Sequence, residues 1–308
     1  MTAQNTPATP AVAPPKKRRG ALIAAVVIAM LVIGGLLFWL LRPAAASTVK
    51  LGVVGASEPY WDTYVAAAAE AGIEVELVDF ADYNQPNPAV TEGELDLNQF
   101  QHIVYLAEYN AASGEDLTPI GSTAIYPLGL YSEQYTDVAD IPAGSTVAIP
   151  SDPSNRARAL LVLQSAGLIT LTGGGSIFDT PADIDAAASK VTVKELDAAL
   201  IGPALPDVAA GVINNDFVAK SGLSFADAIA KDDPNDPNAL PYVNIFAATA
   251  DRAADPVLTK LVEIYQNSPE VLAGVAEASA NTAQPLKTPV ADLQASLKKV
   301  EAETKAQG

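Results

Sequence analysis

The chain has 308 residues, of which 49% are hydrophobic and 18% are charged, with no cysteine and a single histidine, His102. This is the composition of a globular protein, and the absence of cysteine excludes disulfides, thiolate nucleophiles, cysteine-ligated zinc and a lipid-modified N-terminal cysteine. The 36 acidic and 18 basic residues give a net charge of −18. Because such a surface repels phosphodiester backbones, we expect no nucleic-acid partner.

The N-terminal region differs from the rest of the chain. Residues 1–19 are rich in Ala, Pro and Thr and end in KKRR, which predicts a disordered cytoplasmic basic tail. Residues 20–41 carry no charge, and a helix of that length is about 33 Å long, enough to span a hydrocarbon core of about 30 Å. We therefore predict a single-pass transmembrane signal anchor at 20–41, a linker at 42–47 and an extracytoplasmic remainder. The alternative is a signal peptide cleaved after Ala46; we favour the anchor because signal-peptide apolar cores usually run about 7 to 15 residues.

The pattern becomes that of an α/β domain after residue 47. Residues 49–56 form a short apolar run that ends at glycine, residues 63–71 have a helical pattern, and residues 73–80 alternate as a strand does. This order predicts an α/β sheet. Further along, we predict β structure at 120–131, 145–150, 191–196, 211–214 and 241–249, and helices at 153–167, 197–199, 255–266, 268–280 and 291–305.

The helix that begins after Asp152 has the clearest boundaries and carries a candidate binding residue. Asp152 is a predicted N-cap and Pro153 the first helical residue. Arg158 lies near the N-terminus, on the face shared with Ser154 and Asn155, where backbone amides favour an anion and a guanidinium binds a carboxylate through two hydrogen bonds. The alternative, which spacing alone favours, is that Arg158 is an ordinary exposed helix residue.

The stretch from residue 80 to residue 106 concentrates aromatic side chains around the histidine. Tyr83, Phe100 and Tyr105 would supply an apolar wall with His102 among them, although spacing alone favours simple core packing. Two asparagines, Asn214 and Asn244, each follow an apolar strand-like run. A side-chain amide there could accept from an ammonium group and donate to a carboxylate, or it could be a turn residue.

Signatures of enzymes and metal sites are absent from the sequence. It contains no G-x-S-x-G, H-E-x-x-H, Walker or G-x-G-x-x-G motif and no D-x-[DN]-x-[DN]-G calcium loop. We therefore predict that the chain is not an enzyme, that it has no catalytic residues, and that it uses no metal or cofactor.

Four collinear blocks carry a resemblance to a known family. The segments DYNQPNPAVTEGELDLNQFQHIVYL, VAIPSDPSNRARALLVLQSAGLI, GVIN and PYVNI occur in this order. They resemble the methionine-binding lipoprotein family (NlpA/MetQ-like), the solute-binding subunits of methionine ABC importers. The similarity extends from residue 50 to the C-terminal helices.

The resemblance implies a fold and a set of site residues. The fold is a two-lobed periplasmic-binding-protein fold, type II-like, with lobe 1 at 48–128 plus 245–308 and lobe 2 at 129–244. The family's carboxylate-binding arginine corresponds to Arg158, and the asparagines that hold the amino-acid backbone correspond to Asn214 and Asn244. The remaining ligand-binding positions are the aromatic pocket for the thioether at Tyr83, Phe100 and Tyr105, His102 beside it, and Asn155 near the carboxylate.

The function implied is capture of methionine, L-methionine ahead of D-methionine, and its delivery to the permease and ATPase of an ABC importer. We expect a monomer held at the cell membrane by its N-terminal helix. Two features depart from the family: Ser151 replaces the usual Asn, and the lipidated cysteine is missing, so the apolar segment would replace the lipid anchor. The alternatives are a binding protein for another amino acid or small carboxylate, and a surface-anchored enzyme or adhesion protein that has kept the fold.

Overall fold

The computed structural model describes residues 48–235 and 239–307. The chain divides into two units, Met1–Ala46 and Ser47–Gly308, and the description below concerns the second. The tail, anchor and linker predicted from the sequence lie outside the described residues. Within residues 48–235 and 239–307, no helix combines the length and the apolar character needed to cross a membrane. The predicted α/β class is confirmed.

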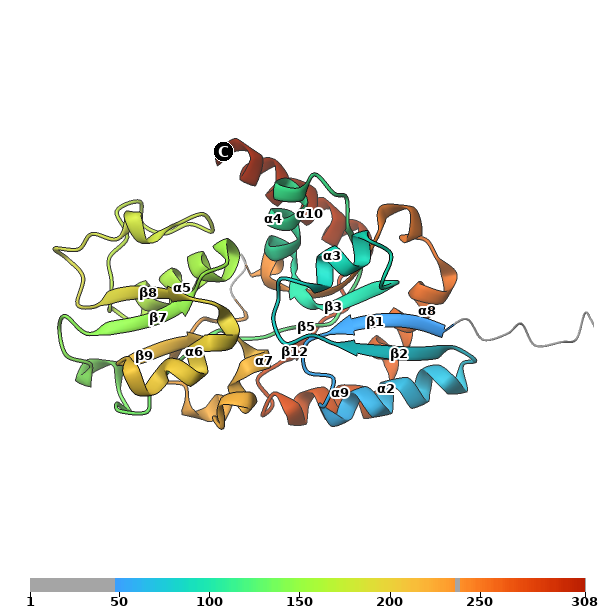
Figure 1. Ribbon diagram of the computed structural model, residues 1–308, viewed down its shortest axis with the longest axis horizontal. Helices are drawn as coiled ribbons and strands as arrows, with labels where there is room; N and C mark the ends of the chain where they lie inside the picture. Colours follow the sequence, from blue (N-terminus) through green and yellow to red (C-terminus); the bar gives the residue numbers. More distant parts are fainter. Residues whose placement is uncertain (1–47, 236–238, 308) are drawn as a thin grey trace, which may run out of the picture. The chain divides into compact units, whose positions relative to one another are not determined.

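Two five-stranded sheets form the framework of this unit (Figure 1). The first has the order β2-β1-β3-β11-β4, in which β1 is parallel to β2 and β3 whereas β11 is antiparallel to β3 and β4. Its strands are β1 (Thr48–Val53), β2 (Glu74–Asp79), β3 (Leu97–His102), β4 (Thr118–Ser122) and β11 (Asn244–Ala248). The last strand of this sheet in chain order, β11, therefore lies inside the sheet, between β3 and β4.

The second sheet has a corresponding arrangement, with the order β10-β6-β9-β7-β8. Here β7 is parallel to β8 and β9, and β6 is antiparallel to β9. The strands are β6 (Gly129–Tyr131), β7 (Thr146–Pro150), β8 (Thr192–Leu196), β9 (Ala210–Ile213) and β10 (Ala230–Lys231). A two-stranded sheet pairs β5 (Ala124–Ile125) with β12 (Gln284–Pro285).

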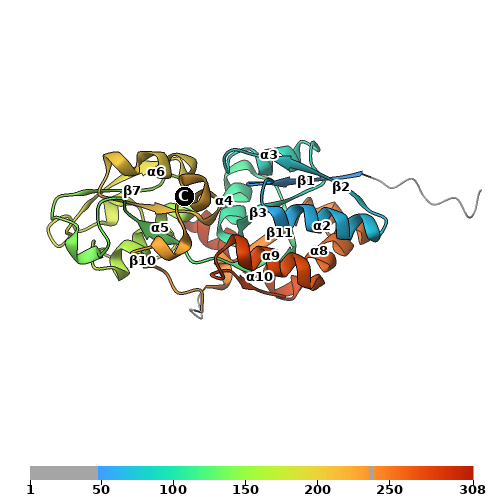
Figure 2. The same cartoon turned by 90° about the horizontal axis from the view of Figure 1, so that it is seen from below.

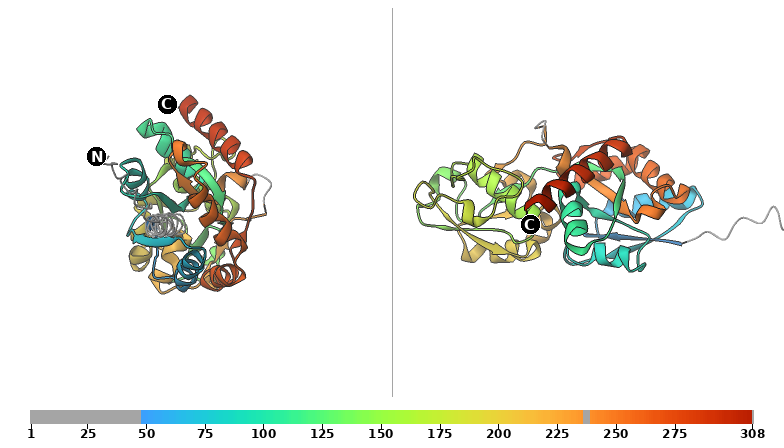
Figure 3. Two further views of the ribbon diagram at one scale, coloured as in Figure 1. Left: turned by 90° about the vertical axis from the view of Figure 1, so that its right-hand side faces the viewer. Right: turned by 90° about the horizontal axis from the view of Figure 1, so that it is seen from above.

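Helices cover both faces of the first sheet (Figure 3). Side chains of α2, α8 and α9 pack on one face, and those of α3, α4 and α10 pack on the other. In the second sheet, α5 packs against one face and α6 against the other. The α-helices are α2 (Pro59–Glu70), α3 (Pro86–Thr91), α4 (Ile103–Ser113), α5 (Pro153–Ser165), α6 (Ala198–Ala204), α7 (Asn215–Val218), α8 (Pro256–Asn267), α9 (Pro269–Ala278) and α10 (Val290–Gln307).

Several predicted boundaries are wrong by three or more residues. The helix predicted at 63–71 begins at Pro59, because proline is well suited to the first helical turn. The strand predicted at 241–249 begins only at Asn244, because Leu240–Tyr242 form a 3-10 turn. Other 3-10 segments are Val138–Asp140, Pro181–Asp183, Leu205–Asp207, Ala219–Ser221, Phe225–Asp227 and Ala250–Arg252.

Separate apolar cores stabilise the two sheets. Under the first sheet, Trp61, Tyr64, Phe246 and Tyr265 are nearly inaccessible to solvent and contact one another as tilted, stacked and edge-on aromatic pairs. A different cluster joins residues of both sheets, including Tyr83 and Phe100 with Tyr131 and Phe217. The helices and strands that supply this shared cluster face one another in the view from below (Figure 2).

Candidate functional site

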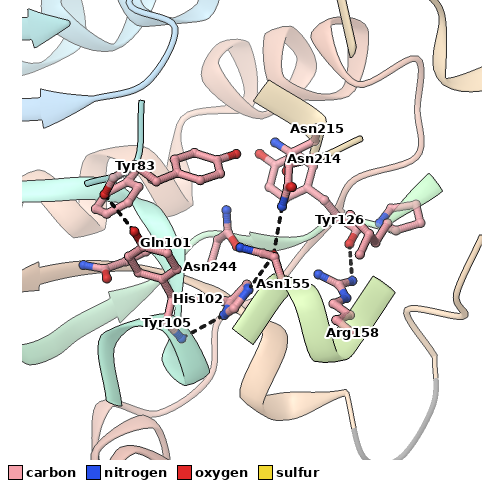
Figure 4. A pocket seen from close by; sticks show the side chains of 13 residues that line it. Tyr83, Gln101, His102, Tyr105, Tyr126, Asn155, Arg158, Asn214, Asn215 and Asn244 are labelled. Carbon is pink, nitrogen blue, oxygen red and sulfur yellow. Dashed lines mark hydrogen bonds between the residues drawn. The ribbon is translucent and has the colours of Figure 1, made fainter. Parts of the chain in front are cut away.

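A small cavity of about 20 Å³ lies where elements of the two sheets meet. It contains all eight residues that the sequence singled out, and most of them are buried (Figure 4). The first sheet and its helices contribute Tyr83, Phe100, His102, Tyr105 and Asn244, and the second contributes Asn155, Arg158 and Asn214. Residues of the stretch 80–106 and of the helix after Asp152 therefore line the same cavity.

Arg158 is fixed in place by three groups. Its Nε donates to Asp232 Oδ2 at 2.7 Å, its Nη2 donates to the Tyr126 carbonyl oxygen at 2.8 Å, and its guanidinium lies 4.5 Å from the centre of the Tyr242 ring. The side chain is 8% exposed. Within the described part of the chain, no group accepts the Nη1 hydrogens. A guanidinium held along one edge in this way presents its remaining donors to an anion.

The start of α5 brings Arg158 and Asn155 to the cavity, as its local sequence predicts. Asp152 is the N-cap, and its Oδ1 accepts from the Asn155 backbone amide at 2.9 Å. Because Asn155 and Arg158 are three residues apart in the helix, both point to the same side. The predicted N-cap and first helical residue are confirmed.

His102 is the N-cap of α4, and its neighbours define its tautomer. Its Nδ1 accepts from the Tyr105 backbone amide at 3.2 Å, so the ring proton is on Nε2, which lies 3.2 Å from Asn155 Oδ1. Burial, together with the nearby Arg158 charge, lowers the pKa of His102 to about 3. The ring is therefore neutral at physiological pH and acts as a hydrogen-bond donor to Asn155.

Asn214 and Asn244 lie at the ends of strands from different sheets. Asn214 follows β9 and donates from Nδ2 to Asn155 Oδ1 at 2.8 Å, while its own Oδ1 is buried without a partner among the described residues. Asn244 opens β11 opposite His102, and its backbone carbonyl accepts from the Thr123 amide at 2.8 Å. Asn214 Oδ1 is thus a buried acceptor in the cavity that is available to a ligand.

Aromatic rings close another part of the cavity. Ring centroids of Tyr83, Phe100 and Tyr105 lie 5.6 to 6.1 Å apart, and the Tyr105 hydroxyl donates to the Tyr83 carbonyl oxygen at 2.9 Å. The Tyr83 hydroxyl reaches the second sheet, where it donates to Asp216 Oδ2 at 2.8 Å. Burial of that carboxylate raises the pKa of Asp216 to about 7. An unbranched apolar side chain fits such a wall.

Several residues at the site were not identified from the sequence. Gln101, Tyr126, Pro127, Leu128 and Asn215 also line the cavity. Residues 126–128 belong to a connection between the sheets, next to the predicted lobe boundary at residue 128. No sequence signal identified Asp232, which is 74 residues from its partner Arg158. Among residues 48–235 and 239–307, no group of three or more His, Asp or Glu could hold a metal ion.

The fold is the mixed α/β fold of periplasmic substrate-binding proteins. One solved structure with this fold is a nutrient-binding protein from Burkholderia cenocepacia bound to methionine, with a TM-score of 0.72 and 36% identity, covering 77% of this chain and 99% of that chain. Another is the substrate-binding protein of a methionine transporter from Streptococcus pneumoniae, with a TM-score of 0.73 and 36% identity, covering 78% and 95%.

Sequence comparison gives the family. The model of the NlpA lipoprotein family matches residues 49–287. A relative from Pasteurella multocida, the probable D-methionine-binding lipoprotein MetQ, is 33% identical over 225 residues, which are 72% of this chain and 80% of the relative. The chain belongs to the NlpA lipoprotein family, and the resemblance seen in its four sequence blocks is confirmed.

Proposed function

We propose that this chain is an extracytoplasmic solute-binding protein that captures methionine and delivers it to an ABC importer. The observation that carries the proposal is a single buried cavity that combines a fixed guanidinium, an unpartnered amide oxygen and an aromatic wall. The relatives whose names or titles mention methionine support the choice of ligand. The same features favour a binding protein over an enzyme.

Each chemical group of methionine has a complementary partner in the cavity. The carboxylate would accept from the Nη groups of Arg158, and the ammonium would donate to Asn214 Oδ1, with Asn244 beside it. The thioether would lie against Tyr83, Phe100 and Tyr105, where a polarizable sulfur gains from aromatic contact. A zwitterion with an unbranched apolar side chain satisfies all three partners at once.

The two sheets would act as two lobes that close on the ligand. We assign lobe 1 to 48–128 plus 245–308 and lobe 2 to 129–244, in a type II-like arrangement with a hinge in the two connecting segments. Asn244, the last residue of the lobe 2 range, opens β11 of the first sheet and would lie at this hinge. Contacts that join the sheets across the cavity support closure, among them the hydrogen bonds between Tyr83 and Asp216 and between His102 and Asn155. The closed form would be the one that docks on the permease.

The proposed location is the outer face of the cell membrane. Residues 20–41 would be a single-pass anchor that keeps the monomeric binding domain near its importer and raises its effective concentration there. Membership of a lipoprotein family supports a membrane-associated protein. Fractionation of cells with and without residues 20–41 tests the anchor; release of the shortened chain into the soluble fraction is the expected result.

A thermal-shift screen tests the ligand class. The panel contains the twenty common L-amino acids, D-methionine and 4-(methylsulfanyl)butanoate, the analogue that lacks the amino group. We expect L-methionine to raise the unfolding temperature most, because only ligands that bind the native state stabilise it. D-methionine shows how far the site selects between enantiomers. A larger shift with a different amino acid would identify that amino acid as the ligand in place of methionine. The absence of a shift with every compound would contradict a binding function.

A further inference from the structure

A chain of hydrogen bonds runs from the N-cap of α5 into the cavity. Its outer end is Asp152, which does not line the cavity. Asp152 Oδ1 accepts from the Asn155 side-chain Nδ2 at 2.9 Å, as well as from the Asn155 backbone amide at 2.9 Å and Ser154 Oγ at 3.0 Å. A carboxylate oxygen that takes three donors acts here only as an acceptor.

This arrangement fixes the direction of the Asn155 amide. Its nitrogen faces Asp152, so its oxygen faces the cavity, where it accepts from Asn214 Nδ2 at 2.8 Å and lies 3.2 Å from His102 Nε2. His102 enforces the same direction independently, because its Nδ1 accepts from the Tyr105 amide and its Nε2 therefore carries the proton. A reversed Asn155 amide would place a donor against that proton.

The direction of the Asn155 amide then fixes that of Asn214. Asn214 is 6% exposed, and it must direct Nδ2 toward Asn155 Oδ1. Its own Oδ1 is left as a buried acceptor without a partner in the described part of the chain. Figure 4 shows the links from His102 through Asn155 to Asn214 as dashed lines. A buried acceptor of this kind requires a donor from the ligand.

We propose that Asn155 is a positioning residue, clamped by Asp152 and His102, that makes the subsite for the ligand's amino group an obligatory acceptor. The inference rests on the proposed function and deepens it. Asn155 Oδ1 already takes two partners within the protein, so Asn155 acts on the ligand through Asn214 rather than as a main contact. The predicted consequence is strong selection for ligands that carry an amino group.

The test compares the affinities of two ligands by calorimetry: L-methionine and 4-(methylsulfanyl)butanoate, which keeps the carboxylate and the thioether. In the unmodified protein we expect methionine to bind at least about 100-fold tighter, since the analogue leaves a buried acceptor unpaired. In Asn155→Leu the ratio of the two affinities, L-methionine over the analogue, should fall by about tenfold or more, because the Asn214 amide is no longer oriented. The α5 cap from Asp152 to the backbone of residue 155 remains.

Three further variants make the readout specific. Arg158→Ala should weaken both ligands and leave the ratio unchanged, because both have the carboxylate. Asp152→Asn keeps an acceptor oxygen and a good N-cap, so it should keep the ratio within about threefold. The double change Asp152→Ser with His102→Phe leaves Asn155 and Asn214 in place but releases both ends of the clamp, and it should lower the ratio as Asn155→Leu does.

The outcomes separate this inference from the proposed function. The inference is wrong if the affinity ratio is unchanged in both Asn155→Leu and the double variant. This holds even if both affinities fall together, because a parallel loss of affinity for both ligands shows a merely structural role. Loss of the discrimination between the two ligands in Asp152→Asn would also contradict the inference. An unmodified protein that binds methionine but does not discriminate against the analogue would overturn the inference alone, whereas absence of methionine binding would overturn the proposed function itself.

Discussion

His102 shows how neighbours determine the chemistry of a residue. In the sequence it was a lone histidine among aromatic residues, and its role could not be separated from core packing. In the structure its Nδ1 caps α4, its Nε2 reaches Asn155, and its ring lies edge-on to Tyr242 with centroids 5.3 Å apart. No free position remains for proton transfer. The residue is therefore a fixed donor between the two sheets.

The titration of His102 is the first prediction at this scale. Its pKa is lowered to about 3, so between that value and the ordinary 6.5 the folded chain binds fewer protons than the unfolded chain. This contribution destabilises the fold as the pH drops below 6.5. Because the chain has one histidine, its Cε1–H proton NMR signal needs no assignment. We expect that signal to stay constant from pH 8 to pH 5 and to titrate near 6.5 in urea; a native midpoint near 6.5 would contradict the burial.

Sequence patterns identified the residues that line the site better than those that hold it. Helix spacing after Asp152 placed Arg158 and Asn155 on one face, and the family resemblance then implied that both line the site. Asp232 gave no signal, because its pairing with Arg158 depends on how β10 and the segment after β5 approach each other. The fold brings together residues that are distant in sequence, and the spacing of residues within one segment does not predict such pairs.

At the scale of elements, α5 was predicted well because its signals are local, whereas α4 was not predicted. The helix α5 has a cap, a proline at its first position and an apolar run, and its start was predicted to the residue. The short strands β5, β6, β10 and β12 have two or three residues each and exist only through their partners. Strand propensity alone cannot predict where such strands lie, because they are stabilised by tertiary contacts with their partner strands.

Packing of α6 on β9 gives a prediction for this scale. A Cβ atom at Gly211 would lie 2.6 Å from Ile201 Cγ2 and 3.1 Å from Leu205 Cδ2, and both of those side chains are buried. Gly211→Ala should therefore lower the free energy of unfolding by about 1 to 3 kcal/mol. The matched control is Gly173→Ala, where a Cβ would have no neighbour within 4 Å; we expect a change of at most about 0.5 kcal/mol. Urea unfolding curves with the same midpoint for both variants would disprove the close packing.

At the scale of the whole molecule, the site is built from both sheets. The aromatic wall, His102 and Asn244 come from the first, and Arg158, Asn155 and Asn214 come from the second. The family resemblance predicted this division for every residue except Asn244, which its bounds placed at the end of lobe 2. Residue patterns alone could not predict it, because the contacts that join the sheets depend on how closely the sheets approach. Tyr83 with Asp216 is an example, because the two partners are 133 positions apart in the sequence.

The most direct test of methionine capture is a calorimetric titration of L-methionine into three proteins. Arg158 lines the cavity, whereas Arg156, two residues earlier on the same helix, pairs with Glu195 and does not line the cavity. We predict that Arg158→Ala weakens binding by about 2 to 5 kcal/mol, because it leaves the ligand carboxylate buried without its partner. We predict that Arg156→Ala changes binding by less than about 0.5 kcal/mol. Equal affinity of Arg158→Ala and the unmodified protein would contradict the account.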